Sequence, residues 1–355
     1  MRQLTAVLGR GVVPADSHVV TADDLGLVRG DGCFDAMRVL DVDGAAAVEN
    51  LDEHLARFAR SAAILGIGFD EPAWRALVVE AVAAWYPVAP EAVLKVVLTR
   101  GTESSASGPT GFLTITELDL DLMDRVRTGI AIRTLDRGYA SDAFAGASWL
   151  LGGAKLLSYA VHAAATRTAK AHGDDDAVFV SSDDYLLEGP TSAVLVLRDG
   201  RLTSTPPGAT GILDSITLRQ IFAAATDAGV PARHELIPVP ELFTADGVWV
   251  VSSIRGVCPV TRLDGRPLPV DPDWHRRVTD WGGFGGLAVA GREVRRAASL
   301  LAHDPDEAGR VRSLVAARCR AHVAGGGTVD ELVVALQVSR VAAERLLDDE
   351  WPLLH

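Results

Sequence analysis

Lysine is rare in this chain, which singles out the residues able to attack a carbonyl group. Of the 34 basic residues in the sequence, only three are lysines, at positions 95, 155 and 170. A lysine that forms a Schiff base must first lose its proton, and this favours a partly buried amine close to other positive charge. Lys155 follows two glycines and an alanine within an apolar stretch, where an unpaired ammonium would be costly. Lys155 is therefore the candidate for Schiff-base chemistry.

Simpler roles exist for each lysine. Lys170 lies late in an alanine-rich predicted helix, a position typical of solvated surface. Lys95 lies within a predicted strand and could point to either face. Lys155 itself could lay its stem over apolar neighbours and keep its ammonium in water. Composition alone leaves both interpretations of Lys155 open.

The elements around these residues predict an α+β protein. Before residue 118 we expect strands at Val39–Asp43, Ala47–Glu49, Val93–Leu98 and Phe112–Thr116, the first two joined by a turn at Asp43-Gly44. A helix is predicted after Asn50, because apolar residues recur there every three or four positions. They are Leu51, Leu55, Phe58, Ala62 and Leu65. This phase leaves Arg57 off the buried stripe.

A second unit follows a connection at residues 118–127. Its predicted strands are Ile130–Arg133, Ala177–Val180, Ala193–Arg198 and Val248–Val251, and its predicted helices are Ala154–Ala171 and Ser215–Asp227. The last segment, Gly282–His355, is glycine-rich at its start and then predicts helices, the last two being Thr328–Leu336 and Arg340–Leu347. We therefore divide the chain into a small domain (1–117), a connection (118–127), a larger domain (128–281) and a helical extension (282–355).

Charge and composition exclude several classes of function. The net charge of −13 argues against binding to nucleic acid or acidic lipid. The last two predicted helices have the spacing of a helix-turn-helix but lack an obvious basic face, so we favour a packing module over DNA binding. No apolar run is long enough to span a membrane, and the three cysteines match no metal-binding spacing. We expect a cytoplasmic protein with no metal.

Eight short motifs occur in order between about residue 20 and about residue 270. They are Gly30–Phe34, Glu53–Arg57, Leu98–Gly101, Ala154–Tyr159, Leu187–Ser192, Gly211–Thr217, Val251–Ser253 and Pro259-Val260. The series resembles the fold-type IV enzymes that use pyridoxal 5′-phosphate (PLP): branched-chain aminotransferases, D-amino-acid aminotransferases and aminodeoxychorismate lyases. The resemblance implies an α+β, two-domain fold like that of D-amino-acid aminotransferase, with the extension added at the C-terminus.

The same resemblance implies roles for individual residues. Lys155 matches the lysine that binds PLP and moves protons during the reaction. Glu188 matches the carboxylate that pairs with the pyridine nitrogen and keeps the ring an electron sink. Arg57 matches the arginine that binds the cofactor phosphate. Taken alone, Glu188 could be a strand-end carboxylate at a turn and Arg57 a solvated helix residue.

Further cofactor contacts are implied near a second helix. Ile216 and Thr217 open this helix, where free backbone N–H groups suit a phosphate, and Ser252 and Ser253 match further phosphate contacts. Tyr159 matches the tyrosine that hydrogen-bonds the phenolic oxygen of PLP. Capping, loop polarity and core packing are the simpler explanations of these residues.

Two arginines match or suggest substrate contacts. Arg100 corresponds to a residue that often binds a substrate carboxylate, and Arg38 could face the same cleft from its strand. The alternative for Arg38 is a charge on the protein surface.

The chain departs from the family pattern at Asp35, Ala193, Ser215 and Leu218. These departures put the subfamily in question more than the binding of PLP.

The motifs Gly30–Phe34 and Val93–Gly101 look most like those of aminodeoxychorismate lyases. We therefore expect a PLP-dependent lyase that converts 4-amino-4-deoxychorismate to 4-aminobenzoate and pyruvate, a step towards folate. The alternative is a class IV aminotransferase acting on branched-chain or D-amino acids. A third hypothesis is a non-catalytic PLP-fold protein whose helical tail binds a partner. In each case the ligand is a small, amino-acid-like anion, and the resemblance implies a homodimer.

Overall fold

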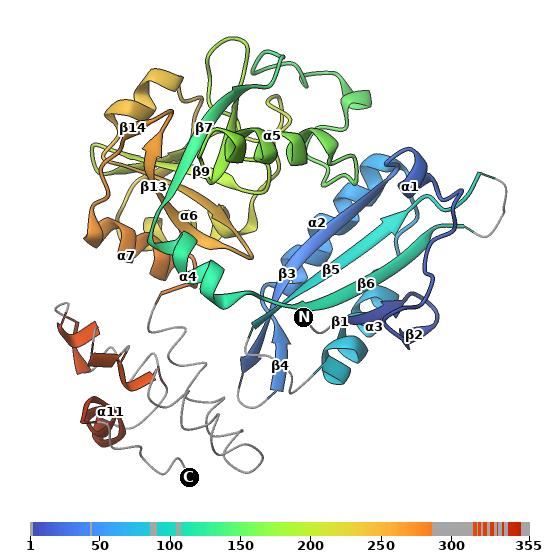
Figure 1. Ribbon diagram of the computed structural model, residues 1–355, viewed down its shortest axis with the longest axis horizontal. Coiled ribbons are helices and arrows are strands. Elements are labelled where there is room, and N and C mark those ends of the chain that lie inside the picture. Colours follow the sequence, from blue (N-terminus) through green and yellow to red (C-terminus); the bar gives the residue numbers. More distant parts are fainter. Residues whose placement is uncertain are drawn as a thin grey trace.

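The structure is a computed structural model. It describes residues 3–42, 45–85, 91–103 and 108–285, and beyond these 315–317, 319–320, 322–324, 327–329, 332, 336 and 340–348. The predicted turn at Asp43-Gly44 and much of the extension, including part of Thr328–Leu336, lie outside the described residues. Two lobes, each built on one sheet, are joined through α4 (Leu120–Thr128), as Figure 1 shows.

The first lobe holds a six-stranded antiparallel sheet in the order β2-β1-β6-β5-β3-β4. Its strands are β1 (Gln3–Val7), β2 (Gly11–Val13), β3 (Gly32–Val42), β4 (Ala45–Val48), β5 (Glu91–Thr99) and β6 (Thr110–Glu117). Its helices are α1 (Leu25–Val28), α2 (Leu51–Leu65) and α3 (Glu71–Trp85). The four predicted strands are all present, and β3 and β5 extend beyond their predicted bounds.

The two faces of this sheet have different partners. Side chains such as Cys33, Met37 and Leu94 join the core beneath α2 and α3. Because neighbouring residues of a strand point to opposite faces, Phe34 of β3 and Lys95 of β5 point the other way, into a cavity. The sheet thus supplies one wall of that cavity.

Helix α2 confirms the predicted periodicity, with Leu55, Phe58 and Ala62 fully buried. Its buried stripe is wider than the apolar spacing indicates. Arg57 is only 5% exposed, so the interpretation that it lies off the stripe was wrong. The reason is a buried acid on the facing strand, Asp35, which the periodicity of one helix cannot reveal.

The second lobe holds an eight-stranded mixed sheet in the order β11-β10-β9-β12-β13-β7-β8, with β14 paired to β13. Its strands are β7 (Ile130–Asp136), β8 (Asp176–Val180), β9 (Ala193–Arg198), β10 (Arg201–Ser204), β11 (Ala232–His234), β12 (Gly247–Ser252), β13 (Gly256–Leu263) and β14 (Arg266–Pro267). Its helical elements are η1 (Ser148–Leu150), α5 (Ala160–Ala171), α6 (Ile216–Asp227), η2 (Val239–Thr244) and α7 (Pro272–Trp281).

The predicted helix Ala154–Ala171 is shorter in the structure, because α5 begins only at Ala160. The chain before it is extended and adds to the free edge of β3. There the N–H of Phe34 donates to the carbonyl of Lys155 (2.9 Å), and the N–H of Leu157 donates to the carbonyl of Gly32 (2.9 Å). This pairing between the lobes satisfies backbone groups that a helix would otherwise satisfy internally.

The described part of the extension has its own small core. Residues including Val315, Cys319, Leu332 and Leu346 form one apolar cluster, and the predicted helix Arg340–Leu347 is present as α11. Within the described residues, no helix combines the length and the apolarity needed to cross a membrane.

Candidate active site

A cavity of about 630 Å³ lies between the two sheets and collects most of the residues singled out by the sequence. Its wall from the first lobe includes Phe34, Arg57 and Lys95. The second lobe contributes Lys155, Tyr159, Glu188, Ser215, Ser252 and Ser253, among others. Residues more than 200 positions apart in the chain therefore meet in one space.

Lys155 reaches this cavity from the extended segment that pairs with β3. Its backbone N–H donates to the Ser61 hydroxyl (3.0 Å), which itself donates to the carbonyl of Arg57 one turn earlier in α2. Gly30, with φ of +70°, allows the close approach, since a Cβ there would meet the hydroxyl of Ser158. The backbone of Lys155 is thus fixed on both sides.

The surroundings of Lys155 favour a neutral amine. Burial, and then the positive charge of Arg57, lower the pKa of Lys155 from 10.5 to about 8. Its ammonium lies 4.7 Å from the centre of the Phe34 ring. A lysine with this pKa is a competent nucleophile and proton carrier close to neutral pH.

Arg57 is held by a buried ion pair. Its Nε and Nη2 donate to the two carboxylate oxygens of Asp35 (2.8 and 2.7 Å), and Nη1 donates to the carbonyl of Asp214 (3.2 Å). Burial opposes the ionisation of Asp35, but the charge of Arg57 and hydrogen bonds from Arg57 and His54 hold its pKa well below the usual range. A guanidinium has five N–H donors, so Arg57 keeps a donor for an anion in the cavity.

Glu188 is the only carboxylate among the residues that line the cavity in the described part of the chain. Its Oε2 accepts a hydrogen bond from the N–H of Leu213 (3.2 Å). Burial raises the pKa of Glu188 to about 7, although Leu213 and the charges of Lys155 and Arg137 oppose that rise. A cationic partner such as a protonated pyridine nitrogen would stabilise its charged form.

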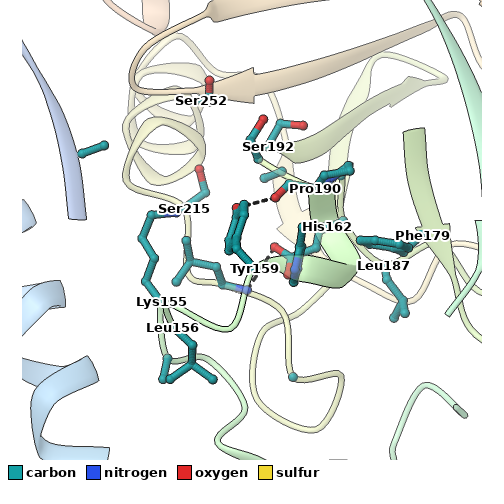
Figure 2. A pocket seen from close by; sticks show the side chains of 18 of the residues that line it. Lys155, Leu156, Tyr159, His162, Phe179, Leu187, Pro190, Ser192, Ser215 and Ser252 are labelled. Atoms are coloured by element: carbon teal, nitrogen blue, oxygen red, sulfur yellow. Dashed lines mark hydrogen bonds between the residues drawn. The ribbon is translucent and has the colours of Figure 1, made fainter. Parts of the chain in front are cut away.

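Tyr159 closes one side of the cavity. Its hydroxyl donates to the carbonyl of Pro190, and its ring stacks on His162 with centroids 4.4 Å apart. Burial, followed by the negative charge of Glu188, raises the pKa of the Tyr159 phenol. In the view of Figure 2, Lys155 and Ser215 lie on one side of Tyr159 and His162 on the other.

The start of α6 offers hydrogen-bond donors at one end of the cavity. Ser215 is the N-cap and accepts from the N–H of Leu218 (3.3 Å), which leaves the first N–H groups, those of Ile216 and Thr217, without intrahelical partners. The hydroxyl of Thr217 lies 3.4 Å from that of Ser253. Ile216 and Thr217 do not themselves line the cavity, whereas Ser215, Ser252 and Ser253 do.

Arg38 does not line the cavity, contrary to our expectation. It is fully buried, bonded to Glu49 (2.7 Å), 3.6 Å from Glu91 and stacked 3.9 Å from the ring centre of Phe284. Its charge is already neutralised by these acids, so the structure gives it a role in holding β3, β5 and the segment after α7 together.

Arg100 also lies outside the cavity of its own chain. It is exposed and bonds to Asp31 (2.6 Å) and to the carbonyl of Leu65 (2.7 Å). Within the described residues, no hydrogen bond or ion pair joins the Arg100 side chain to another predicted site residue, so its substrate contact stays a prediction.

The family follows from this geometry together with a match along the chain. The family model of amino-transferase class IV matches residues 32–263, which contain every residue of the cavity wall. The chain belongs to the class IV aminotransferase family. Enzymes of this family depend on PLP, and the fold of the chain is fold-type IV.

Several known class IV proteins are similar over most of their length. A bifunctional aminodeoxychorismate lyase / D-amino acid transaminase from Mycobacterium tuberculosis is 37% identical over 259 residues, which cover 71% of this chain and 88% of that protein. A fold IV-transaminase from Curtobacterium pusillum is 36% identical, with a TM-score of 0.74 over 79% of this chain and 97% of that one. A hypothetical aminotransferase from M. tuberculosis, in its PLP-bound form, is 33% identical, with a TM-score of 0.73 over 79% and 98%.

The donors of this class IV site fit PLP. Arg57, the first N–H groups of α6 and the serine hydroxyls at 215, 252 and 253 suit a phosphate dianion. Lys155 suits the aldehyde, and Glu188 suits the ring nitrogen. Sequence motifs missed two parts of this arrangement: the buried Asp35 behind Arg57, and the cavity-lining Arg137, whose guanidinium lies 5.1 Å from the ring centre of Phe179. In the sequence, Asp35 was noted only as a departure from the family pattern, a single acid within the apolar run Cys33–Met37.

Proposed function

We propose that this enzyme converts 4-amino-4-deoxychorismate to 4-aminobenzoate and pyruvate. The observation that carries the proposal is the charge of the cavity. Besides Lys155, its wall includes four basic side chains (Arg57, Lys95, Arg137 and Arg255) and one carboxylate, in a chain whose net charge is −13. A local positive cavity in an acidic protein suits a dicarboxylate such as aminodeoxychorismate.

Bound PLP supplies an electron sink for the electrons of the bond that breaks. Residues of the chain bind the cofactor and transfer the proton. Arg57 and the start of α6 hold the phosphate, and Glu188 holds the ring nitrogen in its charged form. Once its amine is free, Lys155 takes the proton from the substrate ring, and pyruvate leaves as the ring becomes aromatic. Its lowered pKa lets Lys155 accept that proton near neutral pH.

Transamination is the second candidate. The similar M. tuberculosis protein is named for both activities. A further structure of the hypothetical M. tuberculosis aminotransferase, 34% identical with a TM-score of 0.73, carries α-ketoglutarate and pyridoxamine phosphate. In transamination, Lys155 would carry a proton between the amino-acid Cα and the cofactor instead of taking one from a ring.

The two reactions separate in one experiment. The PLP-loaded enzyme is incubated with aminodeoxychorismate, and in parallel with D-alanine, D-glutamate or L-leucine. We expect release of 4-aminobenzoate and pyruvate from the first mixture, and none from the Lys155→Ala variant. Conversion of the bound cofactor to pyridoxamine phosphate by the amino acids, with no 4-aminobenzoate, would replace the lyase by an aminotransferase.

We also propose a homodimer. Trp149 in η1 is 75% exposed, and Leu27, Val28 and Val161 are exposed apolar side chains. The end of α1 and the start of α5 are adjacent, since the hydroxyl of Ser158 donates to the carbonyl of Gly30 (3.2 Å). Exposed apolar side chains beside an active site suit a subunit interface. A sedimentation mass of one chain at micromolar concentration would contradict this.

A further inference from the structure

The turn between β12 and β13 carries two of the hydroxyls that line the cavity. β12 ends at Ser252 and β13 begins at Gly256, and these two residues pair across the hairpin. Ser252, Ser253 and Arg255 all line the cavity. Gly256 has a φ of +78°, which lets the chain turn back within a short loop. Hydroxyls on such a turn bind an anion well only if neighbouring contacts hold them in one orientation.

The backbone of Arg255 orients the hydroxyl of Ser252. The N–H of Arg255 donates to Ser252 Oγ (3.2 Å). A serine hydroxyl has one hydrogen to donate and two lone pairs that accept. Because the bond from Arg255 uses a lone pair, it leaves the hydrogen of Ser252 for an anion in the cavity. The carbonyl of Arg255 is held as well, because it accepts a hydrogen bond from the Nε of Arg127 in α4 (3.0 Å).

The side chain of Arg255 ties this turn to two other segments. Its Nη1 donates to Asp176 Oδ2 at the start of β8 (2.6 Å), and its Nη2 donates to Thr191 Oγ1 (3.0 Å). The side chain of Asp176 is 4% exposed and that of Arg255 is 20% exposed, so the ion pair is largely shielded from water. Thr191 follows Pro190, whose carbonyl accepts a hydrogen bond from the hydroxyl of Tyr159 (Figure 2). Arg255 therefore links the turn to the segment that holds Tyr159.

We propose that Arg255 is a positioning residue for the cofactor phosphate. Its ion pair with Asp176 holds the turn so that Ser252 and Ser253 present their hydroxyls to that group. Arg255 acts through the serines, while its own guanidinium is engaged by Asp176 and Thr191. The inference rests on the phosphate contacts proposed for the two serines, and it applies to the lyase and to the aminotransferase alike.

The test compares two ligands that differ only in a phosphate. Pyridoxamine phosphate carries the group and pyridoxamine lacks it, and neither has an aldehyde that could react with Lys155. Their binding to the full-length, PLP-free protein is measured by calorimetry, and the ratio of the two dissociation constants gives the preference for the phosphate. Arg255→Gln removes the charge, Asp176→Asn removes its partner, and Arg255→Lys keeps the charge. The double variant of Arg255→Gln with Asp176→Asn removes both partners.

Arg133→Gln is the matched control. Arg133 forms an ion pair of the same kind with Asp174 (2.9 Å), whose side chain is 2% exposed, and neither residue lines the cavity. Asp174 lies close to Asp176 at the start of β8, so this variant disturbs the same part of the fold. We expect Arg133→Gln to leave the preference for the phosphate unchanged.

We expect Arg255→Gln to weaken the binding of pyridoxamine phosphate by about 10- to 100-fold, the loss that removal of an outer-shell partner causes at metal sites. Binding of pyridoxamine stays nearly unchanged, because it has no phosphate to lose. Asp176→Asn gives a loss of the same size, and the double variant loses no more than either single variant, because each removes the same ion pair. Arg255→Lys loses less, because its ammonium can still pair with Asp176.

Three results overturn the proposal. An unchanged preference in Arg255→Gln removes the role of this residue. Equal losses for both ligands would mean that Arg255 only stabilises the fold. Unchanged or tighter binding of pyridoxamine phosphate by Asp176→Asn, together with a loss in Arg255→Gln, would mean that the guanidinium binds the phosphate directly. If Asp176→Asn does not fold, Thr191→Val removes the other partner of the guanidinium and is judged by the same outcomes.

Failure of this inference can be told apart from failure of the proposed function. Binding of pyridoxamine phosphate requires no turnover, so its dependence on Arg255 stands whichever reaction the enzyme catalyses. Release of 4-aminobenzoate by an enzyme whose phosphate preference ignores Arg255 keeps the lyase and removes the role of this arginine. If Ser252→Ala also leaves the preference unchanged, the phosphate contact of that serine fails, and the positioning by Arg255 fails with it.

Discussion

The amine of Lys155 should become reactive at a much lower pH than an ordinary lysine. Burial and the charge of Arg57 lower its pKa from 10.5 to about 8. For a base, a lowered pKa means that the neutral, nucleophilic form is already present near neutral pH. At pH 7.5 a pKa of 8 leaves about a quarter of the amines free, against about one in a thousand for a pKa of 10.5.

The assay is trace acetylation of the PLP-free protein with acetic anhydride between pH 6 and pH 11. Mass spectrometry of peptides reports each lysine separately, which is simple here because there are only three. We expect the labelling of Lys155 to reach half of its maximum near pH 8. In the Arg57→Gln variant the midpoint rises, but it stays below 10.5, because burial, the larger cause, remains.

Two results would refute this reasoning. Labelling of Lys155 that reaches its midpoint above about pH 10, as for a free lysine, would show that its amine is fully solvated. An unchanged midpoint in Arg57→Gln would show that the two charges do not interact.

Three further outcomes follow from the same geometry. The pKa of Glu188 is raised from 4.5 to about 7, so ionisation of Glu188 destabilises the PLP-free fold as the pH rises from about 4.5 to 7. Above pH 7, the Glu188→Gln variant is therefore expected to be more stable than the wild type, by up to about 3 kcal/mol in denaturant titrations. Below pH 4.5 the two proteins are expected to have the same stability. Equal stabilities at pH 8 would contradict this. The Asp35→Asn variant leaves Arg57 buried without its anion, so it is expected to lose about 3–5 kcal/mol of folding free energy. It is also expected to bind PLP more weakly in a titration. A loss of folding free energy under about 1 kcal/mol would exclude a structural ion pair. Burial raises the thiol pKa of Cys33 to about 12 and that of Cys258 to about 11, so iodoacetamide at pH 8 should modify neither until the protein unfolds, and rapid modification of the native protein would count against their burial.

Local pattern predicted the strands β3–β9 and β12 and the apolar stripe of α2, but not the strands β1, β2, β10, β11, β13 and β14. Residues such as Leu55 and Phe58 recur at helical spacing, and the structure buries them as that spacing predicts. The whole segment Ala154–Ala171 was predicted to be helical. Its first residues, before Ala160, are extended because their hydrogen-bond partners are Gly32 and Phe34, more than 100 residues earlier. No local pattern contains that information.

The candidate site shows the same division. The motifs predicted that Lys155, Arg57, Tyr159 and Glu188 share one site, and in the structure all four line one cavity. The position of Arg38 could not be predicted, because it depends on Glu49, Glu91 and the ring of Phe284, which lie in other parts of the chain.

The orientation of Lys95 could not be deduced, because its neighbours on both sides in β5 are apolar and give no alternation. Only the pairing with β3 decides which face of the strand lines the cavity.

Replacement of Lys155 by alanine tests the central claim most directly. The variant and the wild-type enzyme are loaded with PLP, and release of 4-aminobenzoate and amino transfer from D-amino acids are followed in parallel. The variant is expected to keep bound PLP through Arg57 and the start of α6 but to lose both reactions. Undiminished turnover without the amine at position 155 would contradict the assignment of this cavity as the active site.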